Sequence, residues 1–399
     1  MIAPAIIRLP EPPMDDLRHF RDKAAIVGIG ETQFSKSSGR TEWSLATEAA
    51  AKACADAGLD PSEIDGIIRC SYDAVLQHQL VRSLGIKSLS YHGEVGYGGG
   101  SPCAITTQAA MVVASGMAKY VLCYRSVNLG SGQRYGVSRA GEYVAGETAF
   151  ATPFGHLAPA QWIAMIALRH MHEYGTTSRQ LGAIAVSQRA NANRNPNATM
   201  KGPLSLEDHQ ASRYIAWPLH LFDCCLNSDG AGAYIVTTTE RARALKQTPA
   251  RIMGMGMGMA WNQESVRNYN RSLLTQIPEQ QETAKRVFGM AGVKPADMDV
   301  AQIYDHFTPG VLMALENWGF CKIGEGGPFV ESGAIGWPDG KLPLNTHGGN
   351  LSEAYIHGIT HIIEGVKQLR GTSTSQVKKV ELSFVASAAY VPTAALILH

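Results

Sequence analysis

Three short segments of the 399-residue chain hold the side chains that could do chemistry. Residues 96–103 (GYGGGSPC) open a predicted helix, where backbone N–H groups and the helix dipole favour a developing negative charge. Residues 303–307 (IYDHF) end a predicted strand, and residues 345–358 (NTHGGNLSEAYIHG) form a glycine turn with titratable groups. A tight turn around a buried cysteine explains the first segment equally well. The three segments are the candidates for an active site.

Other catalytic signatures are missing from the sequence. It has no GxxxxGK[ST], HExxH or GxSxG motif, and two glycine-rich near-matches fail to complete GxGxxG. His357 and His361 are four residues apart without a nearby third ligand, so a core or helix-surface pair is favoured over a metal site. The seven scattered cysteines include no CxxC, which is typical of a reduced compartment. We therefore expect no metal and no cofactor bound by this chain.

The composition excludes several classes of partner. Lys+Arg 35 against Asp+Glu 34, with a pI near 7.7 and no basic cluster, argues against nucleic acid and anionic membranes. The longest uncharged stretch, residues 95–118, contains glycines and polar side chains and makes a poor membrane span. Residues 1–20 carry charges where a secretory signal needs an apolar run. We expect a cytoplasmic protein whose ligand is a small molecule or another protein.

Short apolar runs alternate with helical patterns along the chain. Residues 24–30 (AAIVGIG) predict a buried strand, and residues 41–58 predict an Ala-rich helix that ends at a glycine C-cap. A second helix is predicted at 104–116, between strands near 67–69 and 120–124. Strands that alternate with helices predict a layered α/β architecture.

The second half of the chain repeats the plan of the first. Residues 57–65 (AGLDPSEID) match residues 291–299 (AGVKPADMD), and each copy lies between a predicted helix and a predicted strand. Each copy also leads to a glycine pair that opens another helix. The repeat predicts two similar α/β halves packed as layers.

The repeat also divides the chain into segments. An irregular N-terminal arm at 1–23 precedes a first half at 24–265 and a second half at 266–399. The first half carries an insertion at about 125–250, with a helix at 160–174, which we expect to cap a binding cleft.

As a set, the motifs resemble the thiolase superfamily, and within it the sterol-carrier/lipid-transfer-protein branch. The resemblance rests on IVGIGET near the start, the 96–118 segment, NSDGAGA at 227–233, YDHF at 304–307, NTHGG at 345–349 and the apolar C-terminal strand. It covers nearly the whole chain from Ala24 onward and implies a duplicated five-layer α-β-α-β-α fold.

The sequence departs from thiolases where that family performs its chemistry. Counting along the first-half helix places Gly99 where the acyl-accepting cysteine stands, and Tyr304 replaces the residue that opens the family's tetrad. Tyr355, ten residues past Asn345, stands at the catalytic histidine, and Ser387 replaces the second cysteine. The resemblance therefore implies the thiolase scaffold without the thiolase mechanism.

Two phenols in these positions suit a retro-aldol cleavage, which needs no covalent intermediate. We predict that Tyr304 takes the proton of a β-hydroxyl and that Tyr355 serves the acyl-CoA enolate formed when Cα–Cβ breaks. A tyrosine pKa is ordinarily about 10, so the base needs help from its neighbours. Gly99 is further expected to leave room for the Cβ substituent of the substrate. The substrate-binding or oxyanion candidates are Gly99, His306, His347 and Ser387.

This combination resembles the steroid side-chain-cleaving aldolases of the same branch. The resemblance implies that a hydroxylated steroid side-chain CoA ester is split into a steroid ketone or aldehyde and a short acyl-CoA such as propionyl-CoA. It also implies a homodimer and a small OB-fold partner protein that carries a zinc ribbon. Coenzyme A enters as part of the substrate.

Two other interpretations remain open. Cys103, near the start of a helix that Ser101 would cap and Pro102 would open, could be the low-pKa nucleophile of a thiolase or acyltransferase. Against this, Cys103 lies four residues past the family's nucleophile position at Gly99, about 6 Å along a helix. Alternatively, the chain is a non-catalytic acyl-CoA or lipid-binding subunit.

Overall fold

The computed structural model describes residues 18–96, 98–132, 144–260, 266 and 269–399. Most of the predicted arm and one residue of the first glycine turn therefore lie outside the described residues. None of the helices within them is long and apolar enough to cross a membrane.

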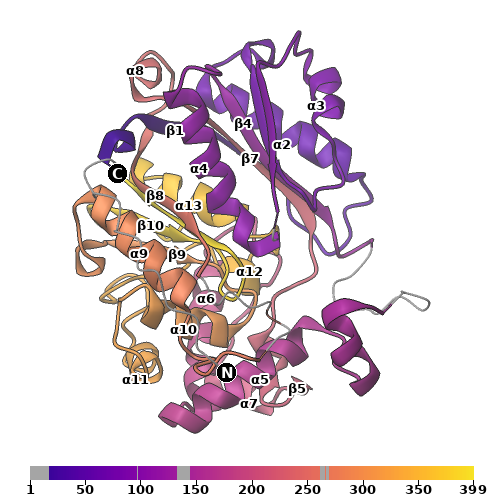
Figure 1. The fold of residues 1–399 in the computed structure, drawn as a ribbon, viewed down its shortest axis with the longest axis vertical. Helices are drawn as coiled ribbons and strands as arrows, with labels where there is room; N and C mark the ends of the chain where they lie inside the picture. Colours follow the sequence, from indigo (N-terminus) through magenta and orange to yellow (C-terminus); the bar gives the residue numbers. More distant parts are fainter. Residues whose placement is uncertain (1–17, 97, 133–143, 261–265, 267–268) are drawn as a thin grey trace, which may run out of the picture.

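One mixed sheet organises the described part of the chain (Figure 1). Its nine strands lie in the order β3-β2-β4-β7-β1-β8-β11-β10-β9. They are β1 (Ala24–Glu31), β2 (Gly66–Cys70), β3 (Tyr91–Val95), β4 (Val121–Asn128), β7 (Asp229–Thr238), β8 (Ala250–Gly258), β9 (Val300–Ile303), β10 (Ser383–Ala386) and β11 (Thr393–Leu398). A separate two-stranded sheet pairs β5 (Tyr214–Ala216) with β6 (Leu219–His220).

The strand order confirms the predicted duplication. In the first half, β2 pairs in parallel with β3 and β4, and β4, β7 and β1 then pair antiparallel. In the second half, β9 pairs in parallel with β10 and, through a single bridge, with the segment at Leu344. There β10, β11 and β8 again pair antiparallel, so β8, which precedes the predicted boundary after residue 265, lies in the sheet of the second half. The two halves meet edge to edge where β1 pairs with β8.

Helices form three layers around these strands. α2 (Glu42–Ala57) packs on the outer face of the first half, and α9 (Pro278–Ala291) and α10 (Thr308–Asn317) pack on that of the second. Between the halves lie α4 (Ser101–Ala114) and α13 (Ile359–Arg370), which share one apolar core with strands of both. This succession of helix and strand layers confirms the predicted five-layer arrangement.

The remaining helices are shorter or belong to connections. They are α3 (Gln77–Leu84), α5 (Pro159–Tyr174), α6 (Ser178–Ala192), α7 (Leu206–Ala211), α8 (Thr239–Ala242), α11 (Gly326–Glu331) and α12 (Gly349–Ser352). Single 3₁₀ turns are η1 (Arg18–Phe20), η2 (Pro61–Glu63), η3 (Gly98–Gly100), η4 (Gly146–Phe150), η5 (Thr152–Phe154), η6 (Leu221–Asp223) and η7 (Pro295–Asp297).

The repeated segments fold alike for a local reason. α2 ends at Gly58 with φ 75° and α9 ends at Gly292 with φ 71°, left-handed conformations that glycine adopts without strain. The proline of each copy then opens a 3₁₀ turn, η2 or η7, before a buried strand. The shared Gly and Pro of the two sequence copies thus mark the same turn in both halves.

The connection between β4 and β7 is shorter than the predicted insertion, because residues at both of its ends belong to the sheet. β4 continues to Asn128 and β7 begins at Asp229. Within the connection, α5 and α6 pack against α10 in the core of the second half. In Figure 1, α5, α7 and β5 lie at the end of the molecule opposite α3 and α8.

Candidate active site

Tyr304 and Tyr355 come from two turns of the second half that meet at one point. Tyr304 directly follows β9, and Tyr355 lies between α12 and α13. Their hydroxyl oxygens are 2.9 Å apart, within hydrogen-bond distance, and the side chains are only 3% and 8% exposed. The N–H of Tyr355 donates to Ser228 Oγ at 3.0 Å. The structure therefore brings the two predicted tyrosines together with their hydroxyl groups facing each other.

Two rings and a glycine hold the Tyr304 side chain. The ring centroid of His306 is 5.3 Å from that of Tyr304, and the His361 ring stacks on it at 6.2 Å and 24°. A Cβ at Gly358 would lie 2.6 Å from Tyr304 Cδ2, so any larger residue would displace the phenol. Packing thus sets the orientation of the Tyr304 ring from several sides.

Gly99 lies directly against the Tyr304 hydroxyl. A Cβ at Gly99 would be 2.6 Å from both Cζ and Oη of Tyr304 and 2.9 Å from Ala388 Cβ. The Gly99 carbonyl accepts from the Ala388 N–H at 2.9 Å, which ties η3 to the turn after β10. The expectation that Gly99 leaves room for a substrate substituent is therefore wrong. The phenol of Tyr304 fills the space into which a nucleophile's side chain would project.

Cys103 and Ser387 contact each other inside the core. The Cys103 N–H donates to Ser387 Oγ at 3.1 Å, and the thiol donates to the Val385 carbonyl at 3.6 Å. Cys103 is buried, and burial raises the pKa of its thiol to about 12. A reactive thiolate needs a shift in the opposite direction. α4 begins at Ser101 after Gly100, so Ser101 is its first residue rather than the predicted cap.

Replacing Cys103 by alanine is expected to leave kcat within about threefold of the wild-type value, because the thiol is protonated and bonded to a carbonyl. Loss of the buried sulfur should lower the free energy of unfolding by about 1–2 kcal/mol. Steady-state kinetics and chemical denaturation measure the two effects. A folded variant that loses more than about tenfold in kcat would support the nucleophilic role instead.

The two predicted histidines lie in different surroundings. His306 Nδ1 is buried without a hydrogen-bond partner among the described residues, next to the Tyr304 ring. Burial lowers the pKa of His306 to about 4, so its ring is neutral near pH 7. His347 instead packs 4.8 Å from the His361 ring, with Nε2 3.6 Å from Glu353 Oε2. The structure therefore places His306 beside the Tyr304 ring, whereas the His361 ring lies between His347 and Tyr304.

The neutral state of His306 predicts a pH dependence of stability. Histidine in an unfolded chain has a pKa of about 6.5, whereas burial lowers the pKa of His306 to about 4. Between these values only the unfolded chain binds the proton, so the stability linked to His306 is complete above about pH 6.5 and falls toward pH 4. His306→Gln should flatten the slope of the unfolding free energy by about 1.4 kcal/mol per pH unit in this range. Denaturation of both proteins across the range measures the slopes, and equal slopes would contradict the assignment.

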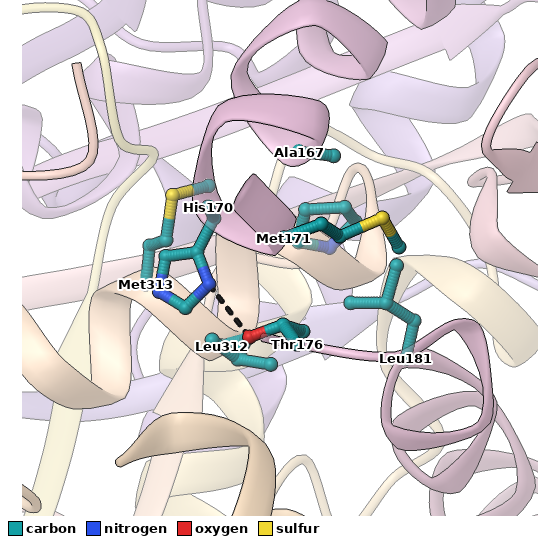
Figure 2. A pocket seen from close by; sticks show the side chains of 8 residues that line it. Ala167, His170, Met171, Thr176, Leu181, Leu312 and Met313 are labelled. Atoms are coloured by element: carbon teal, nitrogen blue, oxygen red, sulfur yellow. Dashed lines mark hydrogen bonds between the residues drawn. The ribbon is translucent and has the colours of Figure 1, made fainter. Parts of the chain in front are cut away.

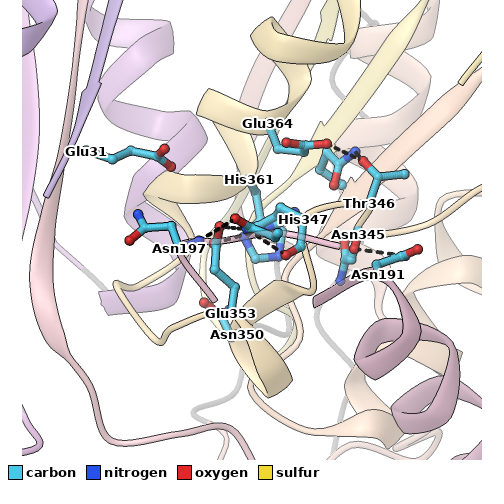
Figure 3. Close-up of polar contacts among 12 residues, drawn as sticks. Glu31, Asn191, Asn197, Asn345, Thr346, His347, Asn350, Glu353, His361 and Glu364 are labelled. Carbon is cyan, nitrogen blue, oxygen red and sulfur yellow. Dashed lines mark hydrogen bonds and ion pairs between the residues drawn. The ribbon is translucent and has the colours of Figure 1, made fainter. Parts of the chain in front are cut away.

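A buried polar network behind the phenols ties two turns together (Figure 3). Asn350 and His361, both labelled in Figure 3, contact the Asp305 carboxylate, which accepts from the Asn350 N–H at 2.9 Å and lies 3.0 Å from His361 Nε2. The Asn345 side chain bonds both backbone groups of Ile303, accepting at 2.8 Å and donating at 2.9 Å. The NTHGG turn is thereby fixed against the end of β9, which sets the position of the residue that follows the strand.

A separate apolar pocket lies between α5 and α10 (Figure 2). His170 and Met313 are among its lining residues, none of which is a predicted site residue. The His170 nitrogens lie 2.8 Å from Thr176 Oγ1 and 3.1 Å from Glu316 Oε2. Because its polar groups are already paired, we assign this pocket to packing rather than to catalysis.

Sequence reasoning missed the residues that hold the turn after Tyr355. Arg125 Nε donates to His357 Nδ1 at 2.9 Å, and Arg125 Nη1 lies 3.2 Å from Asp73 Oδ2. His357 therefore faces Arg125, whereas His361 faces Asp305. The available signal was Arg125 itself, the one charged residue in the strand sequence VLCYRSVN, because a buried strand must supply a partner for such a charge.

The sequence of this chain is similar to a known family and to several named proteins. Residues 260–398 match a family model described as thiolase C-terminal domain-like. The chain is 48% identical over 383 residues to a Thermomonospora curvata protein named steroid side-chain-cleaving aldolase, covering 94% of this chain and 97% of the relative. It is 45% identical to a Mycobacterium tuberculosis protein named 17-hydroxy-3-oxo-4-pregnene-20-carboxyl-CoA lyase, covering 94% of this chain and 99% of the relative.

A solved structure titled Ltp2-ChsH2(DUF35) aldolase is similar over nearly the whole fold. It matches with a TM-score of 0.90 at 46% identity and covers 95% of this chain and 98% of that one. The similarity therefore extends across both halves and the connection between them.

Proposed function

The chain belongs to the thiolase superfamily, in the branch of the steroid side-chain-cleaving aldolases, and from this membership we propose that it cleaves a β-hydroxyacyl-CoA by a retro-aldol reaction. It is a carbon–carbon lyase that acts on a CoA thioester. The substrate is a steroid with a side-chain CoA ester, and the products are a steroid ketone or aldehyde and a short acyl-CoA such as propionyl-CoA. The observation that carries the mechanism is the 2.9 Å contact between the hydroxyl oxygens of Tyr304 and Tyr355.

The substrate class follows from the chemistry in a relative's name. The Mycobacterium tuberculosis relative is named for a hydroxyl at carbon 17 and a carboxyl-CoA at carbon 20. A hydroxyl in that place is β to the thioester carbonyl, as a retro-aldol cleavage requires. Breaking the bond between carbons 17 and 20 would leave a ketone on the ring and release propionyl-CoA. We propose a substrate of the same class for this chain.

The net reaction moves one proton from the β-hydroxyl to the α-carbon and requires no oxidant or reductant. Tyr304, as a phenolate, takes the β-hydroxyl proton, and the O–H electron pair forms the new carbonyl bond. The Cα–Cβ pair moves into the thioester as an enolate, and Tyr355 then gives its proton to the α-carbon. The enolate electrons form the new C–H bond. No step requires a bond to the protein or a free CoA molecule.

The contact between the hydroxyls also supports a direct return to the starting state. After one turnover Tyr304 carries a proton and Tyr355 is the phenolate. A single proton transfer across the 2.9 Å contact restores both groups. The pair holds one proton at the start and end of the cycle and two while the enolate exists.

The enolate oxygen needs hydrogen-bond donors in the same place. α4 begins at Ser101, two residues after Gly99, and the positive end of its dipole is at this turn. We propose that backbone N–H groups of residues 99–101 hold the enolate oxygen, with His306 as a further polar contact to the substrate. Ser387 supports them indirectly, since it accepts the Cys103 N–H in the first turn of α4.

The proposed reaction needs no cofactor held by this chain, because coenzyme A arrives with the substrate. The solved relative's title couples an aldolase with ChsH2(DUF35). We propose that this chain likewise acts with a small partner protein, of the OB-fold and zinc-ribbon type, and that it forms a homodimer in the cytoplasm.

The experiment is a product assay without free CoA. The purified chain, alone and with its native partner, is mixed with a steroid β-hydroxyacyl-CoA, and products are followed by liquid chromatography and mass spectrometry. We expect equal amounts of steroid ketone or aldehyde and short acyl-CoA. Product formation that depends on added CoA would indicate a thiolase or acyltransferase, and no product under either condition would indicate a binding subunit; both outcomes contradict the proposal.

A further inference from the structure

Three buried polar side chains from both halves of the chain form a line that ends at Tyr355. Asp73 follows β2, Arg125 lies on β4, and His357 precedes α13. Arg125 Nη1 is 3.2 Å from Asp73 Oδ2, and Arg125 Nε donates to His357 Nδ1 at 2.9 Å. The His357 ring centroid is 5.0 Å from that of Tyr355, at an edge-to-face angle of 78°. The three side chains are buried, so this line is part of the interior.

The contact with Arg125 decides which nitrogen of His357 carries the proton. A guanidinium Nε keeps its proton, so His357 Nδ1 is the acceptor and the single proton of the neutral ring is on Nε2. Burial, together with the positive charge of Arg125, lowers the pKa of His357 well below its ordinary value. The imidazole is therefore held neutral, in one tautomer and one orientation.

His357 also occupies the turn on which both phenols depend. Its φ of 51° is a left-handed conformation that is unfavourable for a residue other than glycine. Tyr355 lies two residues before it, and Gly358 directly after it packs against the Tyr304 ring. The bond to Arg125 thus ties a strained turn of the second half to a strand of the first.

Asp73 in turn fixes the guanidinium. Its Oδ2 accepts from the Ser126 N–H at 2.8 Å, and its Oδ1 accepts from the Val75 N–H at 2.9 Å. A carboxylate held by two backbone N–H groups keeps one position and balances the buried charge of Arg125. The line therefore starts from rigid backbone and ends at the turn that carries Tyr355.

We propose that His357 is a positioning residue for the Tyr304–Tyr355 pair, and that Arg125, oriented by Asp73, fixes its tautomer and place. The inference rests on the proposed function of the two phenols. His357 acts through the turn and the Tyr355 ring, so its loss disturbs the contact between the hydroxyls and slows the chemical step. Substrate binding is affected much less.

Two substitutions at His357 test this role. His357→Ala removes the acceptor for Arg125 and is expected to lower kcat by about 10- to 100-fold while KM changes by less than about threefold. His357→Asn keeps an acceptor oxygen near the position of Nδ1 and should recover kcat to within about fivefold of wild type. Equal kcat for the alanine variant and the wild type, or no recovery with asparagine in a folded protein, would overturn the proposal.

A charge-neutral pair of substitutions supplies an independent readout. Among the described residues, the charged or titratable groups that face the His357 ring include Arg125, Tyr355 and His306, with Asp73 behind Arg125. The double variant Asp73→Asn/Arg125→Gln removes both charges beside Nδ1, so we expect the pKa of His357 to rise and the acid side of the pH profile of kcat to shift upward. A wild-type pH profile with wild-type kcat would contradict the assigned role.

Arg370→Gln is the matched control, since the Arg370 side chain is also buried and paired, at 2.7 Å from Asp56 Oδ2, but lies at the far end of α13 from His357. It should leave both kcat and the pH profile unchanged. Failure of the proposed function is seen separately, as a wild-type protein that forms no product or as phenol variants that keep full activity. Should the double variant not fold, the two substitutions at His357 still decide the question.

Discussion

Tyr304→Phe is expected to lower kcat by about 100-fold or more, and Tyr355→Phe by a similar factor. Each substitution removes one hydroxyl oxygen and leaves the ring that packs in the core. Without Tyr304 Oη the β-hydroxyl proton has no acceptor, and without Tyr355 Oη the enolate has no proton donor. Loss of either hydroxyl also removes the 2.9 Å contact through which a proton returns from Tyr304 to Tyr355 after each turnover. Single-turnover kinetics with the steroid β-hydroxyacyl-CoA separate this effect from substrate binding.

A double variant and a control make the result specific. Because the two hydroxyls act as one unit, the variant with both substitutions should be little slower than the slower single variant. Tyr124→Phe is the matched control, since Tyr124 is fully buried and its hydroxyl donates to the Val75 carbonyl at 2.6 Å. It should lose about 1 kcal/mol of stability but keep wild-type kcat. Turnover retained by both single phenol variants would contradict the mechanism.

Gly99→Ala should nearly abolish activity, although it adds a single methyl group. The new Cβ would lie 2.6 Å from Tyr304 Cζ and Oη, closer than non-bonded atoms can approach. The phenol must therefore move out of its contact with Tyr355, and we expect kcat to fall by about 100-fold or more. Overpacking of this kind should cost about 1–3 kcal/mol of stability, which denaturation measures.

Gly66→Ala separates the stability effect from the catalytic one. A Cβ at Gly66 would lie 2.8 Å from Val121 Cγ2, a comparable conflict at the start of β2 and outside the proposed site. We expect a similar loss of stability with kcat unchanged. Gly99→Cys, which restores the residue type of a thiolase nucleophile, should be inactive in both the aldol and the thiolysis assay. Wild-type kcat in Gly99→Ala would show that catalysis does not depend on the position of the Tyr304 phenol against Gly99.

Much of the fold could be predicted because its signals are local. The glycine after α2 and the glycine after α9 need left-handed backbone, and the prolines that follow open the same turn, so a short match revealed the duplication. The extent of the insertion was harder to predict. The insertion was predicted to begin at about residue 125, but tertiary pairing with β7 keeps the strand going to Asn128.

The candidate site was predictable in its residue types and not in its contacts. Tyr304 and Tyr355 stand out because they replace the groups on which thiolase chemistry depends. Nothing in the sequence shows that Tyr304 fills the space beside Gly99, since that contact joins residues about 200 positions apart. The bond between Arg125 and His357 is likewise long-range, and only the isolated charge in a buried strand pointed to it.

The central claim is that carbon–carbon cleavage proceeds by proton transfer between the two phenols, never through an acylated protein. The most direct measurement follows product formation and intact protein mass in the same rapidly quenched samples during turnover of a steroid β-hydroxyacyl-CoA without added CoA. We predict many equivalents of short acyl-CoA per protein while the protein mass stays that of the unmodified chain. An acyl mass increment that forms and decays with turnover, located on Cys103, would contradict it.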